Sequence, residues 1–123
     1  MYIILKNKTE KRRLYMPQII VKGITEEQAK SLAIETAPKL GEIVDCPADW
    51  FVFDYMQPKF FDFSGEIKHW PVVQVWWFSR PQEMQDAVAK LLNDYFVGLG
   101  YPGSQISFHI FEYSSYYEEG EHF

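Results

Sequence analysis

The sequence predicts a two-layer α+β domain, with two strand–helix–strand units forming one four-stranded mixed sheet and both helices on one face. Two amphipathic helical patterns indicate this fold, because each lies between two short runs rich in β-branched and aromatic residues. The same order of elements recurs after about fifty-five residues, although the residues themselves differ. The repeat is therefore one of architecture, and each helix is expected to make a right-handed crossover between parallel strands.

The first unit is expected to contain a strand at 18–24, a helix from 25 to about 44 and a strand at 50–55. Thr25 and Gln28 have the spacing of a capping box, which indicates where the helix begins. Pro38 and Gly41 interrupt the helical pattern, so we expect the helix to bend or end early and to fray before Pro47.

The second unit is expected to contain a strand at 72–78, a helix from 79 to about 99 and a strand at 106–113. Ser79 and Gln82 are interpreted as a second capping box. The strand at 72–78 is almost entirely apolar, which predicts that both of its faces are covered. Between the units, the aromatic segment around Pro58 and Ser64 is expected to form a loop or a short hairpin.

Composition limits the function classes. The chain has 123 residues, enough for one domain with a core of its own, and a net charge of −5, which argues against nucleic-acid binding. It has no apolar run long enough to span a membrane, so we expect a cytoplasmic protein. The single cysteine, Cys46, is interpreted as structural because Asp45 and Asp49 flank it. The histidines and Cys46 lack metal-ligand spacing, so we expect neither a metal site nor a cofactor.

One face of the predicted sheet has no helix to cover it. The high aromatic content suggests that this face carries apolar side chains, and association with further copies of the chain would bury them. The sequence therefore predicts a homo-oligomer.

The segment from Met16 through Pro17 to Ile24 resembles the opening of the tautomerase superfamily, which includes 4-oxalocrotonate tautomerase and macrophage migration inhibitory factor. The doubled strand–helix–strand pattern is similar to its longer members, and most of all to a bacterial family of uncharacterised proteins. The resemblance implies a homotrimer. It also implies an enzyme that moves a proton on a small carbonyl compound, with the free secondary amine of Pro17 as the base.

Within the full sequence, however, Pro17 is internal and its nitrogen is an amide, which is not basic. Catalysis by Pro17 requires the mature chain to begin there. Residues 1–16 are basic whereas the rest of the chain is acidic, and they look like what a misassigned start codon would add. We therefore divide the chain into an extension, 1–16, and a tautomerase-like domain, 17–123.

The resemblance also suggests residues that bind substrate. The polar pocket residue on the family's last strand corresponds to His109, and Arg80 is the nearest basic residue for an anionic group. The segment 42–47 is acidic where the family has a basic residue. In a trimer, a neighbouring copy could also bring Lys39, Lys59 or Lys68 to the site. Simpler roles stay open: Pro17 starts an edge strand, His109 is half-buried, and Arg80 lies on a helix's first turn.

Two other functions fit the same residues. The first is a non-catalytic oligomeric domain that binds a small ligand or a protein. The second is a regulatory dimer with the ferredoxin-like fold, which has the same order of strands and helices along the chain. The measured oligomeric state would separate the trimer from the dimer.

Overall fold

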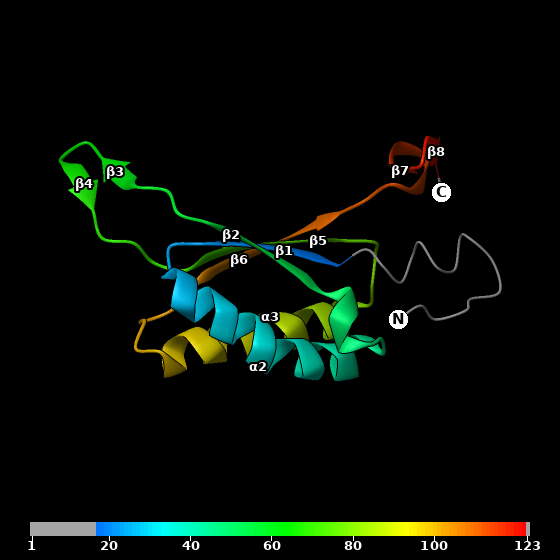
Figure 1. Ribbon diagram of the computed structural model, residues 1–123, viewed down its shortest axis with the longest axis horizontal. Coiled ribbons are helices and arrows are strands. Elements are labelled where there is room, and N and C mark those ends of the chain that lie inside the picture. The colour runs from blue at the N-terminus through cyan, green and yellow to red at the C-terminus, as the bar shows by residue number, and fades with distance from the viewer. Residues whose placement is uncertain (1–16, 123) are drawn as a thin grey trace.

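The computed structural model describes residues 17–122, so the proposed extension, 1–16, lies outside the described residues. The domain has two layers, with two helices packed on one face of a four-stranded sheet (Figure 1). This confirms the predicted fold class. None of the helices in the described part is long and apolar enough to cross a membrane.

The first unit consists of β1 (Gln18–Lys22), α2 (Glu26–Val44), the short 3-10 helix η1 (Ala48–Trp50) and β2 (Val52–Met56). The capping box is confirmed: the Gln28 amide donates to Thr25 Oγ1 at 3.1 Å, and the Thr25 amide donates to Gln28 Oε1 at 3.0 Å. The hydroxyl of Tyr101 also donates to Gln28 Oε1 at 2.7 Å. The start of α2 is thereby tied to the segment that follows the second helix.

The second unit consists of β5 (Val72–Trp77), α3 (Gln82–Gly98) and β6 (Gln105–Ile110). Between the units, β3 (Phe60–Asp62) and β4 (Gly65–Ile67) pair as an antiparallel hairpin, so the predicted excursion is a hairpin. After β6 come the 3-10 helix η2 (Tyr113–Ser115) and a small second hairpin, β7 (Tyr117–Glu118) and β8 (Glu121–His122).

The sheet order is β2-β1-β5-β6. Strands are parallel within each unit, and β1 and β5 are antiparallel where the two units meet. A ferredoxin-like fold separates the two strands of each unit by another strand, whereas here β1 lies directly beside β2. The ferredoxin-like alternative is therefore wrong.

Alternating side chains of the central strands form the core beneath the helices. Ile19 and Val21 of β1 and Val73, Val75 and Trp77 of β5 are essentially inaccessible to solvent. Leucines and other apolar residues of the helices pack on them, including Leu32, Leu40, Val88, Leu92 and Phe96. At 25 cal/mol per Å² of buried apolar surface, each such side chain contributes about 1.5–3 kcal/mol.

α2 ends at Val44, as the sequence predicted. It continues through Pro38, because the carbonyl that loses its partner belongs to Ile34, which is 74% exposed and can bond to water. Gly41 is a packing requirement, since a Cβ there would lie 2.5 Å from the Cys46 carbonyl oxygen. Ser79 does not cap α3: the helix begins at Gln82, and Pro81 in the cap position offers no side-chain hydrogen bond.

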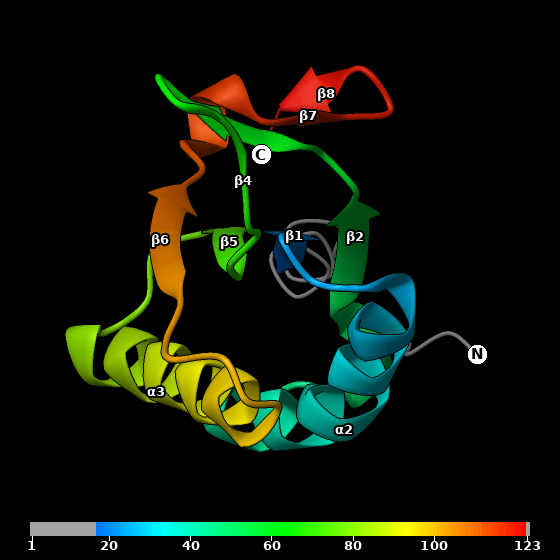
Figure 2. The ribbon, with the colours of Figure 1, turned by 90° about the vertical axis from the view of Figure 1, so that its left-hand side faces the viewer.

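The outer sheet face is uncovered, as expected, but its composition is mixed. The register aligns its side chains in three rows across β2, β1, β5 and β6: Val52–Gln18–Trp76–His109, Asp54–Ile20–Gln74–Ser107 and Met56–Lys22–Val72–Gln105. Alternate residues of β5 face the core and are buried, and those on the open face are half-buried in a single chain. The two hairpins rise on this open side, at opposite ends of the sheet (Figures 1 and 2).

Candidate functional site

Pro17 lies buried immediately before β1, on the side of the sheet that faces the helices. Its carbonyl oxygen accepts a hydrogen bond from the amide of Val52 at 3.4 Å, which ties it to the start of β2. Because Gln18 pairs with Trp76, the antiparallel register continued by one residue places Pro17 opposite Trp77. Trp77 therefore gives the buried Pro17 an apolar neighbour.

Arg80 lies at the same end of the sheet, three residues after Trp77. Its Nη1 donates to the carbonyl oxygen of Phe78 at 2.8 Å, and its guanidinium carbon lies 5.1 Å from the centroid of the Trp77 ring. Burial lowers the pKa of Arg80, while Cys46 and Tyr113 act in the opposite direction. Within residues 17–122 no carboxylate pairs with this guanidinium, so it is a partly desolvated cation with unused donors.

The indole nitrogen of Trp77 is a second unused donor. Trp77 is fully buried, packs on Phe108 at 5.2 Å between ring centroids, and its Nε1 has no hydrogen-bond partner in the described part of the chain. A buried indole N–H normally finds an acceptor. The sequence analysis did not single out Trp77, although a tryptophan inside an apolar strand has a donor that the strand cannot satisfy.

An aromatic cluster covers the same end of β5, and the sequence did not predict it. Phe78 stacks on Tyr113 at 4.6 Å and lies 5.5 Å from both Phe111 and Tyr116. Phe111 and Tyr116 meet at 4.8 Å. The chain beyond β6 thus folds back over the end of β5 and supplies an apolar surround for this end of the sheet.

His109 lies on the opposite face of the sheet. It stacks on Trp76, with 4.3 Å between ring centroids, and its Nε2 is 2.9 Å from the Ser107 hydroxyl. It is two strands from Gln18, which corresponds to about 10 Å at the usual strand spacing. The structure therefore brings Pro17 and Arg80 to one end of the sheet, but it does not bring His109 to them within one chain.

Cys46 also lies near Arg80, and its thiol is a poor nucleophile. Burial raises its pKa to about 11; Arg80 lowers it, and Asp45 and Asp49 raise it further. The sequence identified the acidic neighbours but not burial, which is the larger cause. Among residues 17–122 no group of three or more histidine, cysteine or acidic side chains is arranged to hold a metal ion.

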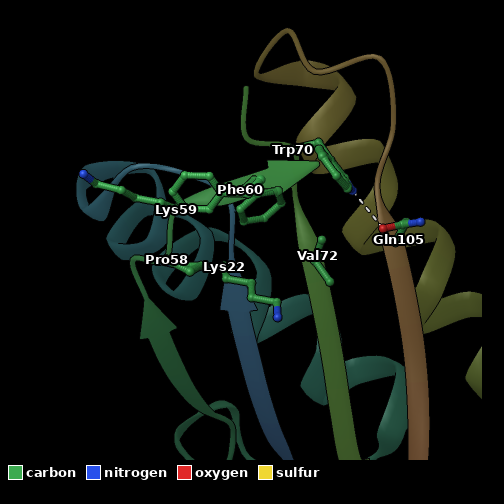
Figure 3. Close-up of a pocket in the computed structure, with 8 residues that line it drawn as sticks. Lys22, Pro58, Lys59, Phe60, Trp70, Val72 and Gln105 are labelled. Atoms are coloured by element: carbon green, nitrogen blue, oxygen red, sulfur yellow. Dashed lines mark hydrogen bonds between the residues drawn. The ribbon is translucent and has the colours of Figure 1, made fainter. Parts of the chain in front are cut away.

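The lysines proposed from the sequence are distributed elsewhere. Lys39 is exposed on α2, and Lys68 is exposed just after β4. Lys59 and Lys22 both line a pocket of about 370 Å³ at the far end of β1, and the Lys59 side chain extends away from Lys22 (Figure 3). None of these lysines contacts Arg80 or Trp77 in the structure.

The comparisons with known proteins agree with this arrangement. The family model described as a domain of unknown function, DUF1904, matches residues 16–122. The crystal structure of a DUF1904 protein from Sebaldella termitidis is 34% identical, with a TM-score of 0.80, and the match covers 88% of this chain and 100% of that one. No curated protein gives a significant match.

Two more distant structures share the fold. A fused 4-OT trimer is 13% identical over 85% of this chain and 94% of that one, with a TM-score of 0.72. A macrophage migration inhibitory factor-like protein from Entamoeba histolytica is 16% identical over 87% and 98%, with a TM-score of 0.66. The chain belongs to the DUF1904 family and has the fold of the tautomerase superfamily.

Proposed function

We propose that this domain is a tautomerase-like enzyme that transfers a proton within a small carbonyl compound, with Pro17 as the base of a mature chain that begins at Pro17. The family match supports this boundary, because it starts at Met16, one residue before the proline. Removal of that methionine would leave a secondary amine at the buried start of β1. Residues 1–16 would then be absent from the working protein.

The surroundings of Pro17 suit a general base. An ordinary α-amine has a pKa of about 7.7–8.0, and an apolar environment lowers it because the charged form is desolvated. A neutral amine at physiological pH can remove the proton from a carbon next to a carbonyl group. The resulting enolate then regains the same proton at another position, so the reaction is an isomerisation with no other reactant.

The observation that carries the proposal is the unpaired cation Arg80 at the Pro17 end of the sheet. Arg80 has no carboxylate partner in the described residues, and the buried Trp77 N–H has no acceptor there. An enolate oxygen or a substrate carboxylate supplies the acceptor that Arg80 lacks, whereas the Trp77 N–H is fully buried in a single chain. We therefore assign Arg80 to the anionic end of the substrate. His109 requires a neighbouring copy to take part, since it faces the other side of its own sheet.

We further propose that the protein is a homotrimer. The open face of a single chain leaves apolar side chains in water: Val52 is 54% exposed and Met56 is 52% exposed, and the hairpin residue Phe63 is fully exposed. The fused 4-OT structure of similar fold is described as a trimer, which supports the same assembly here. Light scattering coupled to size exclusion should give three times the chain mass, and a monomer or dimer would contradict it.

The first test is the intact mass of the protein expressed from its own gene with the natural upstream region. A mass that corresponds to a chain starting at Pro17 is expected. A mass that includes residues 1–16 would end the proline-base mechanism, since the nitrogen would be an amide. The non-catalytic binding domain would then be the better assignment.

The second test is the rate at which the enol of phenylpyruvate loses its ultraviolet absorbance. Pro17→Ala, which replaces the secondary amine by a primary one, should lower kcat/KM at least ~10²-fold, the usual range for loss of a positioned base. Pro58→Ala, remote from Pro17, is the matched control and should change it little. Arg80→Gln should raise KM for this carboxylate more than it lowers kcat, and Arg80→Lys should recover part of the loss. Equal effects of the two proline substitutions would contradict the proposal.

A further inference from the structure

β2 is an edge strand, and one of its two sides is free for pairing. Within residues 17–122 its one neighbour in the sheet is β1. The amide of Val52 donates toward β1, to the carbonyl oxygen of Pro17. Because successive residues of a strand direct their N–H and C=O groups to alternate sides, those of Phe53 and Tyr55 point away from β1. Another strand can therefore pair with β2 at this edge.

A groove lies between the free edge of β2 and α2. Its volume is about 350 Å³, and its lining combines small, aromatic and charged side chains: Glu26, Ala29, Lys30, Ala33, Phe53 and Tyr55. Ile34, one helical turn after Lys30, is 74% exposed and continues the apolar surface along α2. In a strand that pairs with β2, alternate side chains would point toward the helices. The groove is therefore placed to receive apolar side chains of an added strand.

The β3–β4 hairpin is a second apolar surface without a cover. Phe63 at its turn is fully exposed, and Phe61 of β3 is 65% exposed. In the described part of the chain β3 pairs with β4 alone, so one edge of β3 is also free. The hairpin lies on the open side of the sheet, whereas Phe53 and Tyr55 pack on the helix side (Figure 2). A chain therefore does not fill its groove with its own hairpin.

The charges of the two surfaces are complementary. Lys59 and Lys68 flank the hairpin and are exposed, and the Lys59 side chain extends away from the sheet (Figure 3). No carboxylate of residues 17–122 lies within 4.0 Å of either ammonium group. At the groove, Glu26 and Glu27 share one cation, Lys30, at 3.6 and 3.9 Å. The first turn of α2 therefore has an excess negative charge that lysines of a hairpin can approach.

A cyclic trimer has heterologous interfaces, in which one surface of each copy meets a different surface of the next copy. We propose that the β3–β4 hairpin of one copy docks at the β2 edge of the next, with Phe61 and Phe63 covered by the groove beside α2. β3 then adds a strand to the neighbour's sheet. The exposed Val52 and Met56 lie on the same strand β2, so this contact continues into the open face. The inference rests on the trimer proposed above and identifies the segments that hold it together.

The first test is sedimentation velocity of the full chain over a range of concentrations. Phe61→Ser combined with Phe63→Ser should raise the concentration at which half of the protein is trimeric at least tenfold. Ala33→Arg, which places a long charged side chain in the groove, should have the same effect. Val97→Ser, at a 48% exposed position of α3, and Ala89→Arg, outside the groove lining, are matched controls and should change it less than twofold.

The outcomes separate this interface from the trimer itself. A trimeric wild type whose hairpin variant is equally trimeric would overturn the interface and leave the trimer in place. A monomeric or dimeric wild type would overturn both. Because Phe63 is fully exposed and Phe61 largely so, the hairpin variant removes little contact within a chain, and its far-ultraviolet circular dichroism should match the wild type. The hairpin result therefore stands even if Ala33→Arg does not fold.

Mixing the two variants tests the head-to-tail arrangement, at a concentration where each alone is monomeric. The intact hairpin of the Ala33→Arg chain can dock on the intact groove of the chain with the hairpin substitutions. The other hairpin and the other groove of this pair are both altered, so the pair cannot add a third chain. Native mass spectrometry should therefore show one-to-one heterodimers without heterotrimers. A mixture that stays monomeric would overturn the proposal, as would one that forms trimers.

Discussion

Gly23→Ala tests how the open end of the sheet is built. Gly23 has φ of +85°, which costs an L-residue about 1–2 kcal/mol. The new Cβ would also lie 1.8 Å from the Trp70 carbonyl oxygen, so the backbone at Trp70 has to move. Overpacking of this kind costs a further ~1–3 kcal/mol, which gives about 2–5 kcal/mol in total.

At roughly 4 °C per kcal/mol for a domain of this size, Gly23→Ala should lower Tm by about 8–20 °C. Gly100→Ala is the control, because Gly100 also has positive φ, +102°, but nothing lies within 4 Å of its Cβ position. Only the backbone term remains there, so about 4–8 °C is expected. Calorimetry of both variants separates the cost of positive φ from the cost of the contact between the new Cβ and the Trp70 carbonyl oxygen. Equal losses would refute the close approach of Trp70 to β1.

Four other predictions concern single side chains. Thr25→Ala removes a capping box and should cost about 1 kcal/mol in urea unfolding, whereas Ser79→Ala, which removes no cap, should cost almost nothing. Tyr55→Phe deletes the 2.7 Å hydrogen bond to the buried Ile24 carbonyl and should cost about 1 kcal/mol, measured in the same way. Iodoacetamide should alkylate Cys46 at pH 8 about two orders of magnitude more slowly than a free thiol; the rate should rise with pH toward its pKa of about 11 and fall further in Arg80→Gln. Pro38→Ala should stabilise the domain by about 1–2 kcal/mol, because the Ile34 carbonyl regains a partner, while a lower Tm would show that the break in α2 is needed for packing.

The elements that the sequence predicted correctly are those governed by local chemistry. Thr25 and Gln28 form the capping box because both partners lie within one helical turn. The predictions that failed are those in which residues outside the local pattern determine the conformation. Ser79 has the right spacing for a cap, but Arg80 bonds back to the Phe78 carbonyl and the helix starts at Gln82. Gly41 was interpreted as an interruption of the helix, whereas the structure shows that the Cys46 carbonyl oxygen lies too close to leave room for a Cβ at this position.

The candidate site was predictable only in part, for the same reason. The sequence selected Pro17 and Arg80, and the antiparallel meeting of β1 and β5 brings them to one end of the sheet. It gave no indication that Phe111, Tyr113 and Tyr116 fold over Phe78. This arrangement depends on contacts between segments far apart in the chain, which periodicity does not encode.

The two ends of β1 share one electrostatic property. The chain carries a net charge of −5, so its overall field repels anions at long range. Yet Arg80 at one end, and Lys22 and Lys59 at the other, have no carboxylate partner in residues 17–122, although Lys30 and Lys90 on the helices do. Cations left unpaired in an acidic protein are selective for anions that can also bury an apolar surface, because charge alone does not attract the ligand.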